Sequence, residues 1–229
     1  MYVNDYSKHS LNEVTVTYIK DKILSGELKR GDKLIESDIS EGLQISRAPV
    51  REAMRELNVY GLVSFSPRKG NQVLDLSPEE LQELFEIRIS LELQVLDILV
   101  KADLLSDADF AELDGLVAQM AANERREMPY HEKLFYLNHL DVSFHRYLWR
   151  ASGSRKRAQM LEGLFFQLLV TMNENVQTLG SFEEKAAEHA AIVTALRSGD
   201  REEVFYQFKR HLCKYAEAML PDVNLSLAT

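Results

Sequence analysis

The fold of this chain is decided by the stretch Ile45-Ser46-Arg47-Ala48-Pro49-Val50-Arg51-Glu52. Ser46 can cap the start of a helix with its side-chain oxygen, and Pro49 suits the first turn, where its missing N–H has no partner anyway. From Val50 onward, apolar residues recur at i, i+3, i+4 and i+7, as on one buried face of a helix. These residues are Val50, Ala53, Met54 and Leu57. The stretch therefore predicts a helix with one apolar face.

A row of arginines occupies another face of the same helix. Arg47, Arg51 and Arg55 lie four residues apart, so that their side chains point the same way. Because guanidinium groups bind phosphate oxygens and the acceptor edge of guanine, the row favours a DNA-recognition helix. The alternative is a solvated helix surface on which the arginines pair with Glu52 and Glu56.

The sequence on either side of the arginine helix favours DNA binding. An amphipathic helix with Val16, Ile19, Ile23 and Leu24 on its apolar face is expected to end near residues 25–26. After a turn, a short helix is expected over residues 37–43. The arginine helix ends near Gly61, a residue that suits the left-handed conformation after a helix C-terminus. Beyond it, two strands are expected over residues 62–65 and 71–74.

The turn between these strands carries Arg68 and Lys69 at its tip, followed by Gly70. Three helices and a basic-tipped hairpin are typical of a winged helix-turn-helix domain. In that arrangement the third helix enters the major groove, and the hairpin, or wing, touches the backbone or the minor groove. We therefore expect the wing to contact DNA.

Length and composition limit the class of protein. The 229 residues can form one or two domains with sizeable cores. No basic-then-apolar leader opens the sequence and its apolar runs are far shorter than a membrane span, so we expect a cytoplasmic protein with no membrane partner. The single cysteine, Cys213, cannot form a disulfide within the chain, and we expect it to be a small buried residue.

The charge of the chain divides into two parts. Residues 1–75 carry eleven Lys and Arg against eleven Asp and Glu, so the whole net charge of −9 lies in residues 76–229. Because an acidic body repels nucleic acid, the positive charge of the first part must be concentrated on one face. The asymmetry predicts two domains, residues 1–75 and residues 76–229.

The second part is expected to be all-helical. Ser77, Pro78 and Glu80 have the features of a helix start: an N-cap, an N-terminal proline and a capping-box partner. Helices are expected over residues 78–101, 106–124, 130–151, 155–178, 182–198 and 201–219. Because the breaks between them are short, we predict an antiparallel α-helical bundle. The predicted fold class is all-α with a small β wing: an N-terminal winged helix-turn-helix plus a C-terminal helical bundle.

Four metal-binding side chains occupy matching places in these helices. Asp141 and His145 lie four residues apart and project from one face of a helix. His189 and His211 are equidistant from residue 200, so they lie at the same height if the last two helices form an antiparallel hairpin. Packing these helices together would bring one carboxylate and three imidazoles to one place in the bundle, which is the donor set of a metal site.

Each of these residues also has an ordinary explanation. A single histidine on a half-apolar helix is more often structural than a ligand, and an Asp–His pair at i, i+4 can be a surface hydrogen bond. The equal height of His189 and His211 makes coincidence a weaker explanation. His9, His131 and His139 are interpreted as structural.

The first part of the chain resembles the DNA-binding domain of GntR-type bacterial transcription regulators, over about residues 14–75. The match runs through Ile45-Ser46-Arg47-Ala48-Pro49-Val50-Arg51-Glu52-Ala53 and Gly61-Leu62-Val63. The resemblance implies that Arg47 and Arg51 contact DNA and that Gly70 lets the wing approach it. Arg55 is added to this set from helical spacing alone.

The second part resembles the ligand-binding domain of the FadR subfamily, the FCD type. The match rests on Phe85-Glu86-Ile87-Arg88, Asp141-Val142-Ser143-Phe144-His145, Glu188-His189 and His211-Leu212. In metal-binding members of that type an Asp and three His hold a divalent cation. The resemblance assigns this role to Asp141, His145, His189 and His211. Zinc or nickel is expected first, with manganese, iron or cobalt as alternatives.

Four protein ligands would leave one or two positions open on a five- or six-coordinate ion, where a small carboxylate effector could bind. Arg88 matches the family's arginine on the first helix of this domain, and would hold such a carboxylate by a bidentate pair. The alternative for Arg88 is an ion pair with Glu92, four residues on. Gln167, Thr171 and Asn173 are candidates to shape the pocket.

The motifs and the resemblance predict a transcription regulator, in first place a repressor, that binds a palindromic double-stranded DNA operator as a homodimer. A small organic acid beside the metal would control it. No catalytic residue is assigned, and the chain is not expected to be an enzyme. The alternatives are a regulator for which the ion itself is the signal, a purely structural metal, and a metal-dependent hydrolase. Against hydrolysis, Glu188 is expected to point away from the face of His189 and so to supply no general base.

Overall fold

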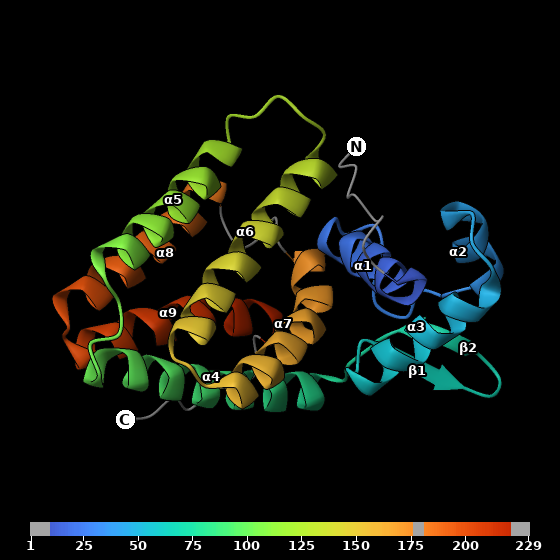
Figure 1. The fold of residues 1–229 in the computed structure, drawn as a ribbon, viewed down its shortest axis with the longest axis horizontal. Helices are drawn as coiled ribbons and strands as arrows, with labels where there is room; N and C mark the ends of the chain where they lie inside the picture. Colours follow the sequence, from blue (N-terminus) through green and yellow to red (C-terminus); the bar gives the residue numbers. More distant parts are fainter. Residues whose placement is uncertain (1–9, 176–180, 221–229) are drawn as a thin grey trace.

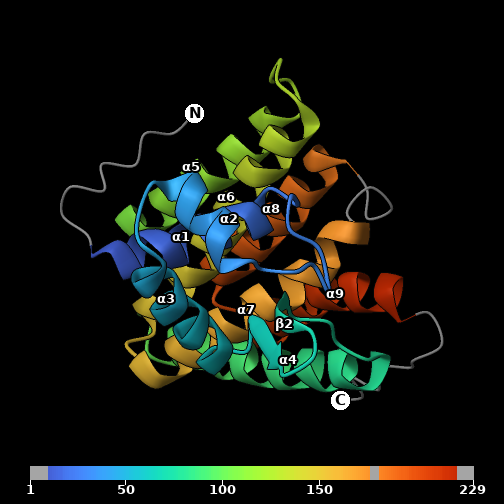
Figure 2. The same cartoon turned by 90° about the vertical axis from the view of Figure 1, so that its right-hand side faces the viewer.

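Three helices and a two-stranded sheet lie beside a larger group of six helices in the computed structural model, which describes residues 10–175 and 181–220 (Figure 1). Figure 2 shows the smaller group from the front, with the helices of the larger group behind it. Among the described residues, no helix combines the length and the apolar character that a membrane span requires.

The smaller group is a winged helix-turn-helix, as the sequence predicts. It contains helices α1 (Leu11–Leu24), α2 (Glu36–Leu43) and α3 (Arg47–Val59) and strands β1 (Val63–Ser66) and β2 (Gly70–Val73). The strands pair in antiparallel fashion, with Val63 opposite Val73 and Ser66 opposite Gly70. Both α1 and α2 pack against α3, whose predicted apolar face is buried.

Two details at the helix starts differ from the prediction. α1 begins at Leu11, before the first residue of the predicted apolar face, because Ser10 and Glu13 form a capping box. Ser46 is the N-cap residue of α3, but its side chain makes no capping hydrogen bond. Gly61, with φ of 70°, leaves the helix in the left-handed conformation as predicted.

The larger group contains the six helices that the sequence predicts, within a few residues at their ends. They are α4 (Pro78–Lys101), α5 (Asp107–Asn123), α6 (Tyr130–Ala151), α7 (Arg155–Asn175), α8 (Phe182–Ser198) and α9 (Arg201–Met219). Residues 176–178 of the fourth predicted helix lie outside the described part. Ser77 and Glu80 form the predicted capping box at the start of α4. α5 packs against α6 and α8, and α4 lies across α6, α7 and α9 (Figure 1).

α1 connects the two groups. Besides α3 it contacts α6 and α7. Asn138 of α6 donates from Nδ2 to Leu24 O at 2.8 Å, and Asn173 of α7 donates from Nδ2 to Ile23 O at 2.6 Å. Because the last carbonyls of a helix lack partners further along it, these two amides cap the C-terminal turn of α1.

Candidate metal centre and nucleic-acid interface

Three helices bring four metal-binding side chains together in the core of the helical group. Asp141 and His145 lie one turn apart on α6, His189 lies on α8 and His211 on α9. One ligand atom from each lies within 4.8 Å of the other three, and all four residues are buried. His189 and His211 lie side by side, as their equal distance from the turn predicts, and their ring centroids are 4.6 Å apart.

Each of the three histidines faces an acceptor with its outer ring nitrogen, Nδ1. The acceptors are Lys185 O for His189 (2.8 Å), Glu188 Oε2 for His211 (3.1 Å) and Glu92 Oε1 for His145 (3.3 Å). A histidine whose Nδ1–H is directed to an acceptor presents the lone pair of Nε2, which is the form that binds a metal ion. The hydrogen bonds of His189 and His211, and the carboxylate close to Nδ1 of His145, therefore suit imidazoles that use Nε2 as the ligand atom.

The inner nitrogens gather around one carboxylate oxygen. His189 Nε2 lies 2.7 Å from Asp141 Oδ1, and His145 Nε2 lies 3.7 Å from the same atom. Burial disfavours protonation of His189, but its hydrogen bond to Asp141 raises its pKa above the ordinary value. Burial also opposes the charged form of Asp141, but the same bond together with the charges of the three histidines outweighs burial and holds the pKa of that carboxyl low. Asp141 is therefore an anion that requires positive charge beside it, either from a proton on His189 or from a cation.

The other two histidines are disposed to stay neutral. Burial lowers the pKa of His145, and burial together with the nearby His189 lowers the pKa of His211 to about 4. His145 Nδ1 is buried with no hydrogen-bond partner among the described residues, since its approach to Glu92 lacks hydrogen-bond geometry. Three imidazoles and one carboxylate suit zinc, nickel, cobalt or iron, so the donor set fits a divalent cation.

Arg88 lies beside the cluster and is 1% exposed. Its Nε is 3.4 Å from Glu92 Oε1, so the ion pair considered as the alternative explanation is formed. Its Nη2 is also 3.4 Å from His145 Nε2, and its guanidinium lies 4.6 Å from the centre of the Phe165 ring. Because Glu92 engages Nε, the pair with Glu92 and a contact of the terminal nitrogens with a ligand are compatible.

Sequence reasoning missed the roles of two carboxylates. Glu92 was considered only as a partner of Arg88, yet it also accepts from Trp149 Nε1 at 2.7 Å and faces His145. Glu188 was expected to point away from the face of His189, and it is not one of the four clustered side chains. It instead contacts the outer nitrogen, Nδ1, of His211, and this contact was not predicted. Applying the equal-height argument to Glu188 would have found this contact, because its counterpart in the hairpin is residue 212.

Neither the other histidines that the structure describes nor the cysteine joins the cluster. His131 and His139 lie near the start and middle of α6 and are exposed, and His9 lies outside the described residues. Cys213 is half-buried rather than buried, because α9 leaves it near the surface.

A small cavity adjoins the cluster on its side toward α1. Asp141 and His189 line it together with Asn138, Asn173 and Lys185. Its volume is about 10 Å³, which is room for about one water molecule. An organic acid could enter only if side chains moved.

The three side chains of α7 that were candidates to shape the pocket have different positions. Asn173 lines the cavity, and Thr171 is buried. Gln167 instead donates from Nε2 to Tyr60 O at 2.8 Å, and so contacts the winged group.

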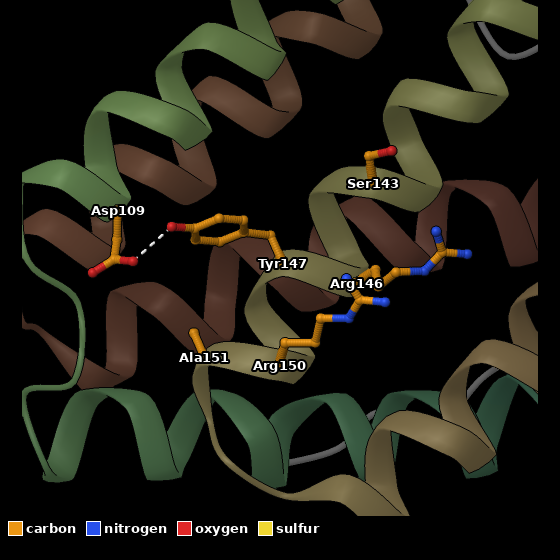
Figure 3. Close-up of a pocket in the computed structure, with 6 residues that line it drawn as sticks. All are labelled: Asp109, Ser143, Arg146, Tyr147, Arg150 and Ala151. Atoms are coloured by element: carbon orange, nitrogen blue, oxygen red, sulfur yellow. Dashed lines mark hydrogen bonds between the residues drawn. The ribbon is translucent and has the colours of Figure 1, made fainter.

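The outer face of α6 carries a separate surface pocket of about 380 Å³ (Figure 3). Its lining residues are Asp109, Ser143, Arg146, Tyr147, Arg150 and Ala151. The Tyr147 hydroxyl donates to Asp109 Oδ1 at 2.6 Å and ties α6 to α5. None of these six residues belongs to the buried cluster, which projects from the opposite face of α6.

The arginine row of α3 is exposed, as the sequence predicts for Arg47, Arg51 and Arg55. Arg51 pairs with Glu36 of α2 at 3.0 Å, rather than with the glutamates of its own helix. Its side chain is nevertheless 57% exposed, so Glu36 orients the guanidinium without covering it. Neither of the other two arginines has an ion-pair partner among the described residues, and they are accessible to phosphate or base edges.

The wing presents its basic tip to solvent. Arg68 and Lys69 are exposed between β1 and β2. Gly70 has φ of 77°, a conformation that L side chains rarely adopt, and a Cβ added there would meet nothing within 4 Å. The glycine is therefore explained by its backbone conformation and not by packing within the chain.

Comparison with known proteins gives matches to both parts of the chain. The family described as "Bacterial regulatory proteins, gntR family" matches residues 11–73, and the family described as "FCD domain" matches residues 83–213. The regulator YdhC of Bacillus subtilis is 29% identical over 144 residues, which are 63% of this chain and 62% of that protein.

Two further relatives align over more of the chain. The regulator McbR of Escherichia coli is 27% identical over 80% of this chain and 81% of its own length. The gluconate operon transcriptional repressor of Bacillus subtilis is 25% identical over 82% of this chain and 76% of its own length. The solved structure of Escherichia coli McbR/YncC superposes with a TM-score of 0.79 at 22% identity, over 94% of this chain and 99% of that one, and this likeness shows the fold.

Proposed function

Because this chain belongs to the GntR family of bacterial transcription regulators and has an FCD domain, we propose that it is a repressor controlled by a carboxylate ligand at a metal centre. Residues 1–75 would bind DNA and residues 76–229 would bind the metal and the effector. The family consists of regulators and not of enzymes. One relative is named a transcriptional repressor, which supports repression as the direction of control here.

The observation that carries this proposal is the buried cluster of Asp141, His145, His189 and His211. We propose that these four side chains hold a divalent cation, zinc or nickel before manganese, iron or cobalt. When bound, the cation would supply open coordination positions for a small carboxylate. Arg88, with Nη2 close to His145 Nε2, would bind the same carboxylate from the side.

On DNA, the protein would act as a cytoplasmic homodimer on a palindromic operator. Each α3 would enter the major groove with Arg47, Arg51 and Arg55, while Arg68 and Lys69 of the wing contact the backbone. The two-fold axis of the dimer would match the palindrome of the site. An effector can shift this equilibrium only by binding one arrangement of the domains more tightly, typically with 1–3 kcal/mol of coupling.

A binding experiment tests the DNA half of the proposal. Arg51→Ala should weaken binding to the region upstream of the protein's own gene by about 1–3 kcal/mol, since it removes a base-reading guanidinium. Gel-shift or anisotropy titration gives the dissociation constants. Arg197→Ala, which changes an exposed arginine paired with Asp114 in the helical group, is the matched control and should bind like the wild type. Equal binding by Arg51→Ala and the wild type contradicts the assignment of α3.

A metal analysis tests the other half. The purified protein should hold one divalent ion per chain, and His211→Ala should lose it, because a ligand of the set is gone. His139→Ala changes a histidine of α6 outside the cluster and should keep the ion. Elemental analysis measures the ratio of metal to protein for all three. If the wild type takes up no zinc or nickel when either is supplied, the metal-dependent part of the proposal fails.

The small cavity favours one alternative, in which the ion itself is the signal. With room for about one water molecule, the cavity holds no organic acid without rearrangement. Operator binding titrated with zinc alone, and with zinc plus simple di- and tricarboxylates, separates the two cases. A response to zinc that no acid alters supports metal sensing, whereas a response to an acid at constant zinc supports effector control.

A further inference from the structure

Glu92 of α4 is a fully buried carboxylate that accepts hydrogen bonds from two side chains and is closely approached by a third. Its Oε2 accepts a hydrogen bond from Trp149 Nε1 at 2.7 Å. Its Oε1 lies 3.4 Å from Arg88 Nε and 3.3 Å from His145 Nδ1. None of these four residues is more than 1% exposed. A single oxygen atom therefore faces both the arginine beside the cluster and one member of the cluster.

Stability alone gives little reason for this arrangement. Replacing a buried ion pair with apolar side chains of similar volume is often neutral or stabilising, because both charges lose their hydration. The neighbouring rings of Phe165 and Phe208 are fully buried, so the surroundings already suit apolar groups. What the pair contributes is orientation, since Glu92 links α4 to α6 through Trp149 and His145.

The orientation matters most for His145. An imidazole with a carboxylate beside Nδ1 carries its proton on that nitrogen and keeps the Nε2 lone pair for a ligand. His145 Nε2 is turned toward the cluster, 3.7 Å from Asp141 Oδ1 and 3.4 Å from Arg88 Nη2. Without a carboxylate at Nδ1, either nitrogen could carry the proton.

We propose that Glu92 is a positioning residue that directs Nε2 of His145 to the metal and holds Arg88 next to it. This inference rests on the proposed metal site. Glu188 has a similar place at His211, but its side chain is 15% exposed and it also pairs with Lys214. Water can replace Glu188 in part, whereas no water reaches Glu92, so the larger effect belongs to Glu92.

The test compares zinc affinity in the full-length wild type and Glu92→Gln. Glutamine has nearly the same size. With its carbonyl oxygen on Trp149 Nε1, its amide N–H₂ would face His145 Nδ1 and favour the tautomer with the proton on Nε2, which leaves no Nε2 lone pair for the metal. Zinc affinity, measured by competition with a chromogenic chelator at neutral pH, should fall about 10–100-fold. Asp109→Asn removes the negative charge beside Tyr147 on the outer face of α6 and is the matched control, with unchanged affinity expected.

A second pair of variants guards against a folding defect, because Glu92→Gln leaves Arg88 buried without its counterion. Arg88→Met keeps Glu92 at His145, and Arg88→Met/Glu92→Gln removes both charges. Far-UV circular dichroism and thermal melting check the fold of each. The double variant should bind zinc about 10-fold or more weakly than Arg88→Met.

The outcomes separate this inference from the proposed function. If Glu92→Gln, or the double variant relative to Arg88→Met, binds zinc as tightly as its reference, the positioning role is wrong while the metal site stands. If the wild type binds no zinc, the proposed metal site itself is wrong, and the role of Glu92 is overturned with it. A loss confined to the variants that lack Glu92 supports the inference.

Discussion

Asp21 of α1 has a carboxyl group whose charged form is disfavoured by partial burial. Burial raises the pKa of its carboxyl from 3.8 to about 6. A carboxyl with a raised pKa binds more protons in the folded state than in the unfolded state between these two pH values. Its protonated form therefore favours folding below pH 4, and that contribution is lost as the pH rises through about 6.

The prediction at this scale is that Asp21→Asn stabilises the protein at pH 7–8 and has little effect at pH 4. Because the carboxyl is only partly buried, solvent screening limits the gain to about 1 kcal/mol. Thermal melting at the two pH values measures the difference. Asp38→Asn changes an exposed aspartate of α2 and is the control for the loss of a carboxylate as such. Equal stabilisation by Asp21→Asn at both values contradicts the proposed cause.

At the scale of elements, two glycines show how the same substitution has opposite effects in a wing and in a helix. Gly70 begins β2 with φ of 77°, where an added Cβ is strained even though the space is open. Gly163 lies within α7, and an added Cβ there also meets nothing within 4 Å. In a helix, alanine is preferred to glycine, because glycine loses more backbone freedom on folding.

We therefore expect Gly70→Ala to destabilise the protein by about 1–2 kcal/mol and Gly163→Ala to stabilise it by about 1 kcal/mol. Urea unfolding measures both free energies. Only Gly70→Ala should also weaken operator binding, since it alters the wing beside Arg68 and Lys69. If Gly70→Ala stabilises the protein as Gly163→Ala does, the backbone conformation of the wing is not the reason for glycine at position 70.

At the scale of the whole molecule, the candidate metal centre and the winged group share two side chains. Asn138 lies one turn before Asp141 and lines the small cavity, while its Nδ2 donates to Leu24 O and to Asn173 Oδ1. Asn173 lines the same cavity and donates to Ile23 O. A change in the cavity that moved these amides would alter their hydrogen bonds to the C-terminal turn of α1. Because α1 packs against α3, such a change could reach the recognition helix.

This contact gives the prediction at the molecular scale. Asn138→Ala should make operator binding less sensitive to zinc, because the link to α1 is removed. The ratio of the operator dissociation constants measured with and without zinc should therefore move toward one. Gln167→Ala removes a contact between α7 and Tyr60 that does not line the cavity, and it should leave the ratio nearer to the wild-type value. An unchanged ratio in Asn138→Ala would place the coupling elsewhere.

Much of the fold could be predicted, because it depends on local rules. The apolar spacing of α3, the capping box at Ser77 and the left-handed Gly61 are each set by residues within a turn of one another. The cluster was predictable in part for a related reason. One residue spacing pairs Asp141 with His145, and one symmetry about a turn pairs His189 with His211, whereas the packing of α6 against α8 and α9 brings the two pairs together. The start of α1 at Leu11 was missed, although its capping box is equally local.

By itself the sequence determined the order of helices and wing, the exposed arginine row and the four residues of the candidate centre, because periodicity and turn chemistry act over short distances. The tertiary structure alone decided which groups from other helices contact these functional side chains and join the two parts of the chain. Glu36 at Arg51, Glu92 at His145 and Asn138 at Leu24 O each join residues on different helices. Such contacts depend on how helices rotate and cross, which helical spacing within a single segment does not specify.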